Sequence, residues 1–125
     1  MSLLSVCGLT VRLGDATVVD DVSFDVAPGE AVGIVGESGS GKTQTALALL
    51  GLSPPSARVT GSIRLDGQEL VGAPEPALDA VRATRLAMVF QDPLLALNPY
   101  LRIGRQLGLV LEAHGLSAGR ETPER

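Results

Sequence analysis

An eight-residue segment rich in glycine constrains the fold of this chain more than any other feature. It fits the pattern G-x-x-x-x-G-K-[ST], and its residues are Gly36, Glu37, Ser38, Gly39, Ser40, Gly41, Lys42 and Thr43. Lys42 is the only lysine of the chain, since every other cationic side chain is arginine. A compact ammonium on a flexible stem suits a narrow cradle of backbone amides better than a planar guanidinium does. The segment therefore predicts a phosphate-binding loop, the P-loop, which requires a strand before it and a helix after it.

Each residue type in this loop has a chemical role. The glycines permit backbone angles that a side chain would forbid, and successive N–H groups then form an anion-binding nest. A helix beginning near Lys42 adds the positive end of its dipole, and the lysine ammonium reaches the β- and γ-phosphates. The Thr43 hydroxyl is the expected Mg²⁺ ligand. We predict that residues 36–43, together with Thr45, bind the phosphates of a nucleotide, with Lys42 also acting in catalysis.

The alternative explanation is a chance match to the motif, because 15 of the 125 residues are glycine. The neighbouring segments argue against it. Residues 31–35 are continuously apolar, as expected of a strand buried on both faces, and residues 43–52 form an apolar stretch of helical length. Strand, glycine-rich turn and helix thus follow one another in the order that the motif requires.

The rest of the chain divides into short elements. Residues 6–13 and 22–26 are strand-like and predict an antiparallel ribbon ahead of the main sheet. Further strands are expected over 59–65 and 86–90, the latter of the buried type, and further helices over 73–84 and 101–114. The expected fold is α/β: a P-loop NTPase core with an N-terminal antiparallel β-ribbon, followed by the start of a helical subdomain.

Composition excludes several classes of function. The net charge is −4 and no cluster of cationic residues occurs, which argues against a nucleic-acid partner. A single cysteine, Cys7, rules out an internal disulfide and a multi-cysteine metal site. No apolar stretch approaches the roughly 20 residues that span a bilayer, and the first 13 residues lack the features of a secretory signal. A cytoplasmic location is expected.

Two segments together resemble the ATP-binding subunits of ABC transporters. The first runs from Val22 to Thr43 and contains the loop. The second, Val89-Phe90-Gln91-Asp92-Pro93 followed by Leu97-Asn98-Pro99, is similar to the Q-loop of that family, in the form found in its dipeptide, oligopeptide and nickel import branch. The resemblance implies that Gln91 contacts Mg²⁺ and the region of the attacking water. It also places Leu13 where an aromatic residue of the family stacks on adenine, so this chain offers only an apolar contact to the base.

The resemblance also implies an organisation and a set of partners. Residues 1–100 would form the P-loop and Q-loop half of the ATP-binding core, and residues 101–125 the start of a helical subdomain. The family's signature loop, the acidic pair that ends a strand and the switch histidine are not recognised in this chain, which is expected to be an N-terminal portion. ATP, Mg²⁺, a second ATP-binding subunit and membrane permease subunits are implied, with attachment to the cytoplasmic face of the inner membrane.

Three other functions are weighed against this interpretation. A GTPase requires an Asn-Lys-x-Asp motif, which a chain with one lysine at residue 42 cannot contain. A small-molecule kinase shares the P-loop, but it does not predict the Q-loop-like segment or the ribbon before the loop. The third alternative is a chain that binds nucleotide without hydrolysing it, because the acidic residues that catalysis requires are not recognised.

Overall fold

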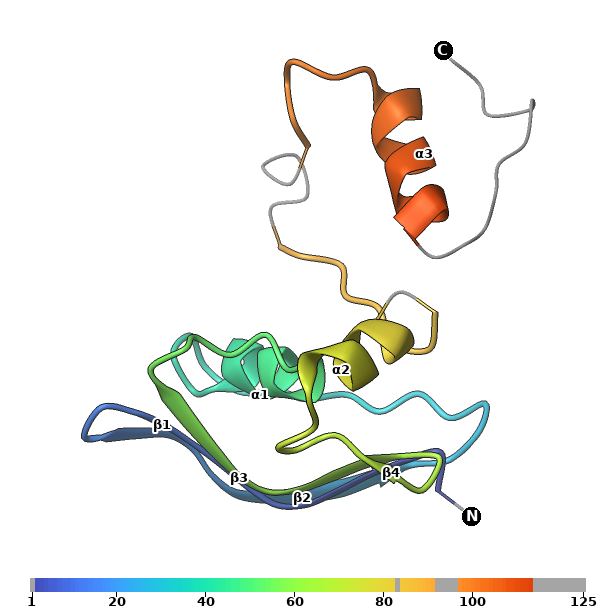
Figure 1. Ribbon diagram of the computed structural model, residues 1–125. Coiled ribbons are helices and arrows are strands. Elements are labelled where there is room, and N and C mark those ends of the chain that lie inside the picture. The colour runs from blue at the N-terminus through green and yellow to red at the C-terminus, as the bar shows by residue number, and fades with distance from the viewer. Residues whose placement is uncertain (1, 83, 92–96, 114–125) are drawn as a thin grey trace. The chain divides into compact units, whose positions relative to one another are not determined.

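The computed structural model in Figure 1 describes residues 2–82, 84–91 and 97–113. These residues belong to two compact units, 1–87 and 88–125, which we describe separately. The glycine-rich loop lies in the first unit, and Gln91 lies in the second.

A four-stranded antiparallel sheet forms the framework of the first unit. Its strands are β1 (Leu4–Leu13), β2 (Ala16–Val26), β3 (Ala57–Leu65) and β4 (Gln68–Glu69), in the order β2-β1-β3-β4. β1 and β2 form a hairpin that turns at Gly14, whose φ of +60° lies in the region that glycine tolerates best. The predicted antiparallel ribbon is therefore confirmed, and both of its strands begin earlier in the chain than the sequence pattern indicates.

Two helices, α1 (Lys42–Leu49) and α2 (Glu75–Val81), lie on one side of this sheet (Figure 1). Side chains of the sheet pack against them to form one apolar core. Leu9 and Ile63 at its centre are fully buried, and Ala48 of α1 and Leu78 of α2 close it from the helical side. Both helices fall within their predicted ranges, 43–52 and 73–84, apart from the first residue of α1.

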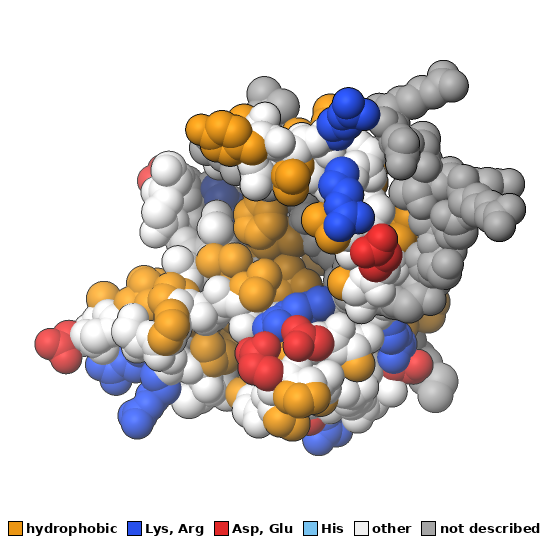
Figure 2. All heavy atoms as spheres, turned by 45° about the horizontal axis from the view of Figure 1, so that its top comes forward, with side chains coloured by type: hydrophobic (Ala, Val, Ile, Leu, Met, Phe, Trp, Pro, Cys, Tyr) orange, Lys and Arg blue, Asp and Glu red, His pale blue; other side chains and the backbone are white. Residues whose placement is uncertain are grey.

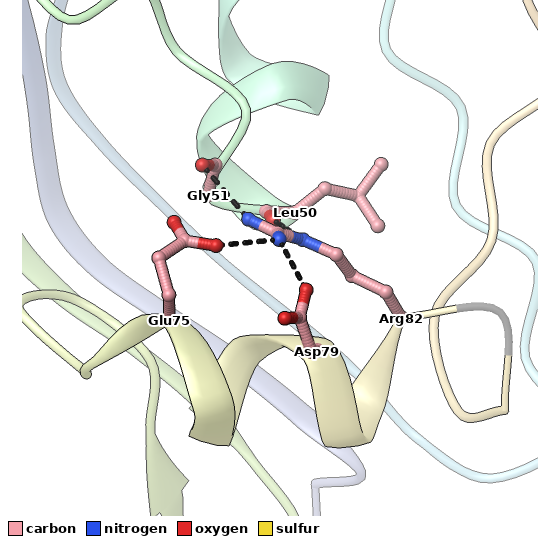
Figure 3. A network of polar contacts seen from close by, with 5 residues as sticks. All are labelled: Leu50, Gly51, Glu75, Asp79 and Arg82. Carbon is pink, nitrogen blue, oxygen red and sulfur yellow. Dashed lines mark hydrogen bonds and ion pairs between the residues drawn. The ribbon is translucent and has the colours of Figure 1, made fainter. Parts of the chain in front are cut away.

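Arg82, at the end of α2, joins the two helices (Figure 3). Its guanidinium donates hydrogen bonds to the carbonyl oxygens of Leu50 at 2.9 Å and Gly51 at 3.1 Å, just beyond the last turn of α1. It also forms ion pairs of 2.9 Å with the carboxylates of Glu75 and Asp79. One side chain thus pairs with two acids of α2 and binds the carbonyl end of α1, which links α2 to the helix that follows the loop.

The predicted buried strands over 31–35 and 86–90 are not found. Neither segment belongs to the sheet. Residues 31–35 are all exposed, Val35 at 94%, whereas residues 86–90 are mixed: Leu86 is half-buried against the core and Val89 is 90% exposed. Exposed hydrophobic side chains are plainly visible at the surface in Figure 2. A strand buried on both faces needs neighbouring strands and covering helices. Within the part of the chain that the structure describes, no strand runs alongside residues 31–35.

The second unit contains helix α3 (Ile103–Ala113), close to its predicted range of 101–114. Gln106 attaches the preceding turn to this helix: its amide nitrogen donates to the carbonyl oxygens of Asn98 and Leu101 at 3.0 Å, and its amide oxygen accepts from the Asn98 N–H at 2.9 Å. Residues 114–125, which complete the expected helical segment, lie outside the described residues. No helix among the described residues is long and apolar enough to cross a membrane.

Candidate functional site

The glycine-rich loop of residues 36–41 is shaped by its backbone. Gly39 and Gly41 have φ angles of +82° and +100°, in the region that favours glycine. The Ser40 N–H donates a hydrogen bond of 3.1 Å to the Glu37 carbonyl oxygen, which closes a turn. A Cβ atom on Gly36 would lie 2.5 Å from the Ser40 hydroxyl oxygen, so the two ends of the loop approach closely. Positive φ angles therefore favour glycine at positions 39 and 41, and the Ser40 side chain lies where a Cβ atom of Gly36 would be.

Gly41 also fixes the loop against the sheet. A Cβ atom at this position would lie 2.3 Å from the carbonyl oxygen of Val18 in β2 and 3.5 Å from a methyl group of Val19. Since real side-chain atoms do not approach a backbone oxygen so closely, only glycine permits this contact. β2 therefore forms a wall beside the loop.

Helix α1 begins immediately after Gly41 with no side-chain cap and no acidic residue in its first turn. Its first amide groups have no intrahelical acceptor, as in every α-helix, and they carry the positive end of the helix dipole. The Thr45 N–H and hydroxyl both donate to the Gly41 carbonyl oxygen at 2.9 Å. Both bonds engage the Gly41 carbonyl oxygen on the helix side. The free N–H groups at the start of α1 then face the loop, where they suit an anion.

Lys42 folds back across the loop. Its ammonium donates to the Gly36 carbonyl oxygen and, at 3.4 Å, to that of Glu37. The side chain is half-buried, and its charge is held by main-chain dipoles of the loop itself. An ammonium held by exposed carbonyls can exchange them for the stronger charge-assisted bonds that a phosphate offers.

A cavity of about 410 Å³ lies between the loop and β2. Four of the predicted site residues line it: Ser40, Gly41, Lys42 and Thr45. The structure adds residues that the motif did not predict, from β2 and the segment before the loop: Thr17, Val18, Val19, Asp20, Val22, Phe24, Ile34 and Val35. The sequence pattern predicts a strand over 22–26, but nothing local indicates that this strand meets the loop.

Other predicted site residues lie outside this lining. Thr43 is exposed in the first turn of α1, and Glu37 and Ser38 are exposed in the loop. Leu13 is the last residue of β1, opposite Ala16 and half-buried. Their contacts with a ligand stay predictions.

Gln91 belongs to the second unit and is exposed there. Asp92 and Pro93, which complete the Q-loop-like segment, lie outside the described residues, so the role of this segment stays a prediction. Among the described residues, no group of three His, Cys, Asp or Glu side chains gathers to hold a metal ion.

Comparison with known proteins gives a family match and many relatives. The family model described as "ABC transporter" matches residues 19–122. The chain is 48% identical to the oligopeptide transport ATP-binding protein OppD of Escherichia coli, over 90% of this chain and 35% of that protein. It is 48% identical to the peptidoglycan transport ATP-binding protein YejF of Agrobacterium fabrum, over 98% of this chain and 24% of that protein.

A mycobacterial relative also matches most of this chain over a small part of its own length. The oligopeptide transport ATP-binding protein OppD of Mycobacterium bovis is 42% identical over 98% of this chain and 21% of its own length. The chain thus matches these relatives almost throughout, yet it spans only 21% to 35% of their lengths.

Proposed function

This chain belongs to the ABC transporter family, and on that premise we propose that it binds ATP·Mg²⁺ as the N-terminal part of an ATP-binding subunit that energises the import of peptides or similar small solutes. The names of its relatives, which are oligopeptide and peptidoglycan transport ATP-binding proteins, support the solute class. Residues 1–100 would supply the P-loop and Q-loop half of the core, and residues 101–125 the start of the helical subdomain.

The observation that carries the proposal is the position of Lys42. Its ammonium bonds the Gly36 carbonyl oxygen within the loop, and the N-terminus of α1, which no side chain caps, begins at the same residue. Lys42 also lines the cavity beside β2. Amide groups, a helix dipole and a mobile cation converge there, which is the combination that binds a chain of phosphates.

Each residue has a defined task in this proposal. Lys42 leaves the Gly36 and Glu37 carbonyls and binds the β- and γ-phosphates, while the amides of residues 37–43 hold the phosphate oxygens. The Thr43 hydroxyl would ligate Mg²⁺, and the Gln91 amide oxygen would ligate the metal or accept a hydrogen bond from water without adding charge. When bound, Mg²⁺ neutralises charge on the phosphates. Leu13 offers the base an apolar contact in place of an aromatic ring.

Partners follow from the family. A second ATP-binding subunit would complete the site, and permease subunits would dock the complex on the cytoplasmic face of the inner membrane. Nucleic acid is not an expected partner of a chain with net charge −4. We assign ATP hydrolysis to the whole subunit and expect the 125 residues alone to bind without turnover, because the signature loop and the acidic pair are not recognised among them.

Titration with ATP·Mg²⁺ tests the proposal. We expect Lys42→Ala to weaken binding about ten- to hundredfold, since it removes charge-assisted hydrogen bonds to phosphate. Arg64→Ala is the matched control, because it removes one exposed positive charge from β3 and should leave the affinity unchanged. Equal binding by Lys42→Ala and the unsubstituted chain would contradict the P-loop assignment. Phosphate release is followed in parallel, and sustained turnover would contradict the expected lack of hydrolysis.

A further inference from the structure

The cavity beside the loop has one acidic side chain that the phosphate chemistry does not use. Among the described residues that line it, only Lys42 and Asp20 are charged. A carboxylate beside a chain of phosphates is repelled by them, and this repulsion grows in a partly enclosed site. A nucleotide that fills the cavity should therefore place its phosphates at Lys42 and a hydrogen-bond donor at Asp20.

A β-bulge places Asp20 in the cavity wall. β1 and β2 are in register at Val11–Val19 and again at Leu9–Val22, so two residues of β2 oppose one residue of β1 between these pairs. Asp21, the second of the two, has a φ of +48°, and its N–H donates to the Thr10 hydroxyl at 3.1 Å. Bulges re-aim side chains at sheet edges and beside active sites. Here Val19, Asp20 and Val22 all line the cavity.

The position of Asp20 along β2 agrees with this division of the cavity. Val18, whose carbonyl oxygen meets Gly41 of the loop, precedes Asp20 by two residues. At strand spacing the Cα atoms of these two residues lie about 7 Å apart. The backbone of Asp20 therefore lies beyond the point where β2 meets the loop.

We propose that Asp20 determines specificity by accepting hydrogen bonds from the vicinal 2′- and 3′-hydroxyls of the ribose, an inference that rests on the proposed nucleotide function. An ionised carboxylate is purely an acceptor, and its two oxygens match two neighbouring hydroxyl donors. Acidic residues bind ribose hydroxyls in the same way in dinucleotide-binding folds. The sugar contact has added importance here because Leu13 replaces an aromatic stacking partner for the base.

The test compares ATP·Mg²⁺ with 2′,3′-dideoxy-ATP·Mg²⁺ by titration of the full chain. We expect the unsubstituted chain to bind ATP about tenfold more tightly than the dideoxy analogue, as for the loss of charge-assisted hydrogen bonds. Asp20→Ala should bring the ratio of the two affinities close to one. Asp25→Ala, which removes an exposed carboxylate from the same strand outside the cavity, should retain the full ratio.

The outcomes separate the two proposals. If the unsubstituted chain binds both nucleotides equally, or if Asp20→Ala keeps the tenfold ratio, Asp20 does not recognise the sugar. If Asp20→Ala binds both nucleotides more tightly by the same factor, the ratio is unchanged. Asp20 then only repels the phosphates, and the inference is overturned. If the alanine variant does not fold, Asp20→Asn, which has nearly the same shape, takes its place. Its ratio of ATP affinity to dideoxy-ATP affinity should fall below that of the unsubstituted chain. Failure to bind either nucleotide would instead contradict the proposed function.

Discussion

Gly41 shows how one missing side chain positions the loop. Its φ of +100° already disfavours any other residue, and the Val18 carbonyl oxygen occupies the space where a Cβ atom would lie. Gly39 shares the first constraint, with a φ of +82°, but has no atom within 4 Å of its Cβ position. The two glycines of one motif therefore differ in what they contribute to the fold.

We expect Gly41→Ala to destabilise the chain more than Gly39→Ala does. Both substitutions incur backbone strain of about 1–2 kcal/mol. Gly41→Ala must in addition displace β2 or α1, and overpacking of this kind costs about 1–3 kcal/mol. Urea unfolding followed by circular dichroism measures both free energies. Equal losses for the two variants would show that the contact with Val18 does not restrain the loop.

The sequence motif identifies the residues of the loop but not their neighbours. The motif predicts unusual backbone angles at its glycines because that requirement is local. The contact between Gly41 and Val18, and the place of Asp20 in the cavity, depend on how β2 crosses the loop. Alternation in β2 indicates which residues share a face, yet it does not identify what that face contacts.

At the scale of elements, the helices and the ribbon were the most predictable parts. Pro74 caps α2 in an extended conformation, and Pro76 lies in the first turn, where its missing N–H would have no intrahelical acceptor. The helix ends at Val81, within its predicted range. The link between α1 and α2 was not predictable. It depends on Arg82 reaching two carbonyl oxygens more than thirty residues earlier in the chain.

We expect Arg82→Ala to lower the free energy of unfolding by about 2 kcal/mol, because it leaves the Leu50 and Gly51 carbonyls without their charged donor. Arg82→Lys should recover little of this loss, since an ammonium cannot reproduce the planar fork that binds carbonyls and carboxylates together. Arg85→Ala is the control: its ion pair with Asp66, at 3.3 Å, is largely exposed and should contribute less than about 1 kcal/mol. Similar losses for Arg82→Ala and Arg85→Ala in chemical denaturation would contradict the bridging role.

At the scale of the whole molecule, the main difference between the sequence prediction and the structure concerns the two apolar segments expected to be buried strands. Residues 31–35 and 86–90 have the composition of central strands, and the sequence pattern detects that composition correctly. Burial is a property of the neighbours as much as of the segment. The described sheet ends at β2 and β4 and provides no partner for either segment. Most of their side chains therefore remain at the surface, although Leu86 packs against the core.

This exposure predicts that the chain associates with itself as its concentration rises. Exposed apolar segments with unpaired backbone groups are sites of aggregation. We expect Val89→Lys, at a position that is 90% exposed, to weaken association about tenfold without changing the melting temperature, because burial of a valine contributes about 1.5 kcal/mol and this one packs against little. Sedimentation velocity over a range of concentrations measures the effect. Asp15→Asn raises the net charge by the same single unit at an exposed turn, so a similar change in that variant would attribute association to charge and not to the apolar segment.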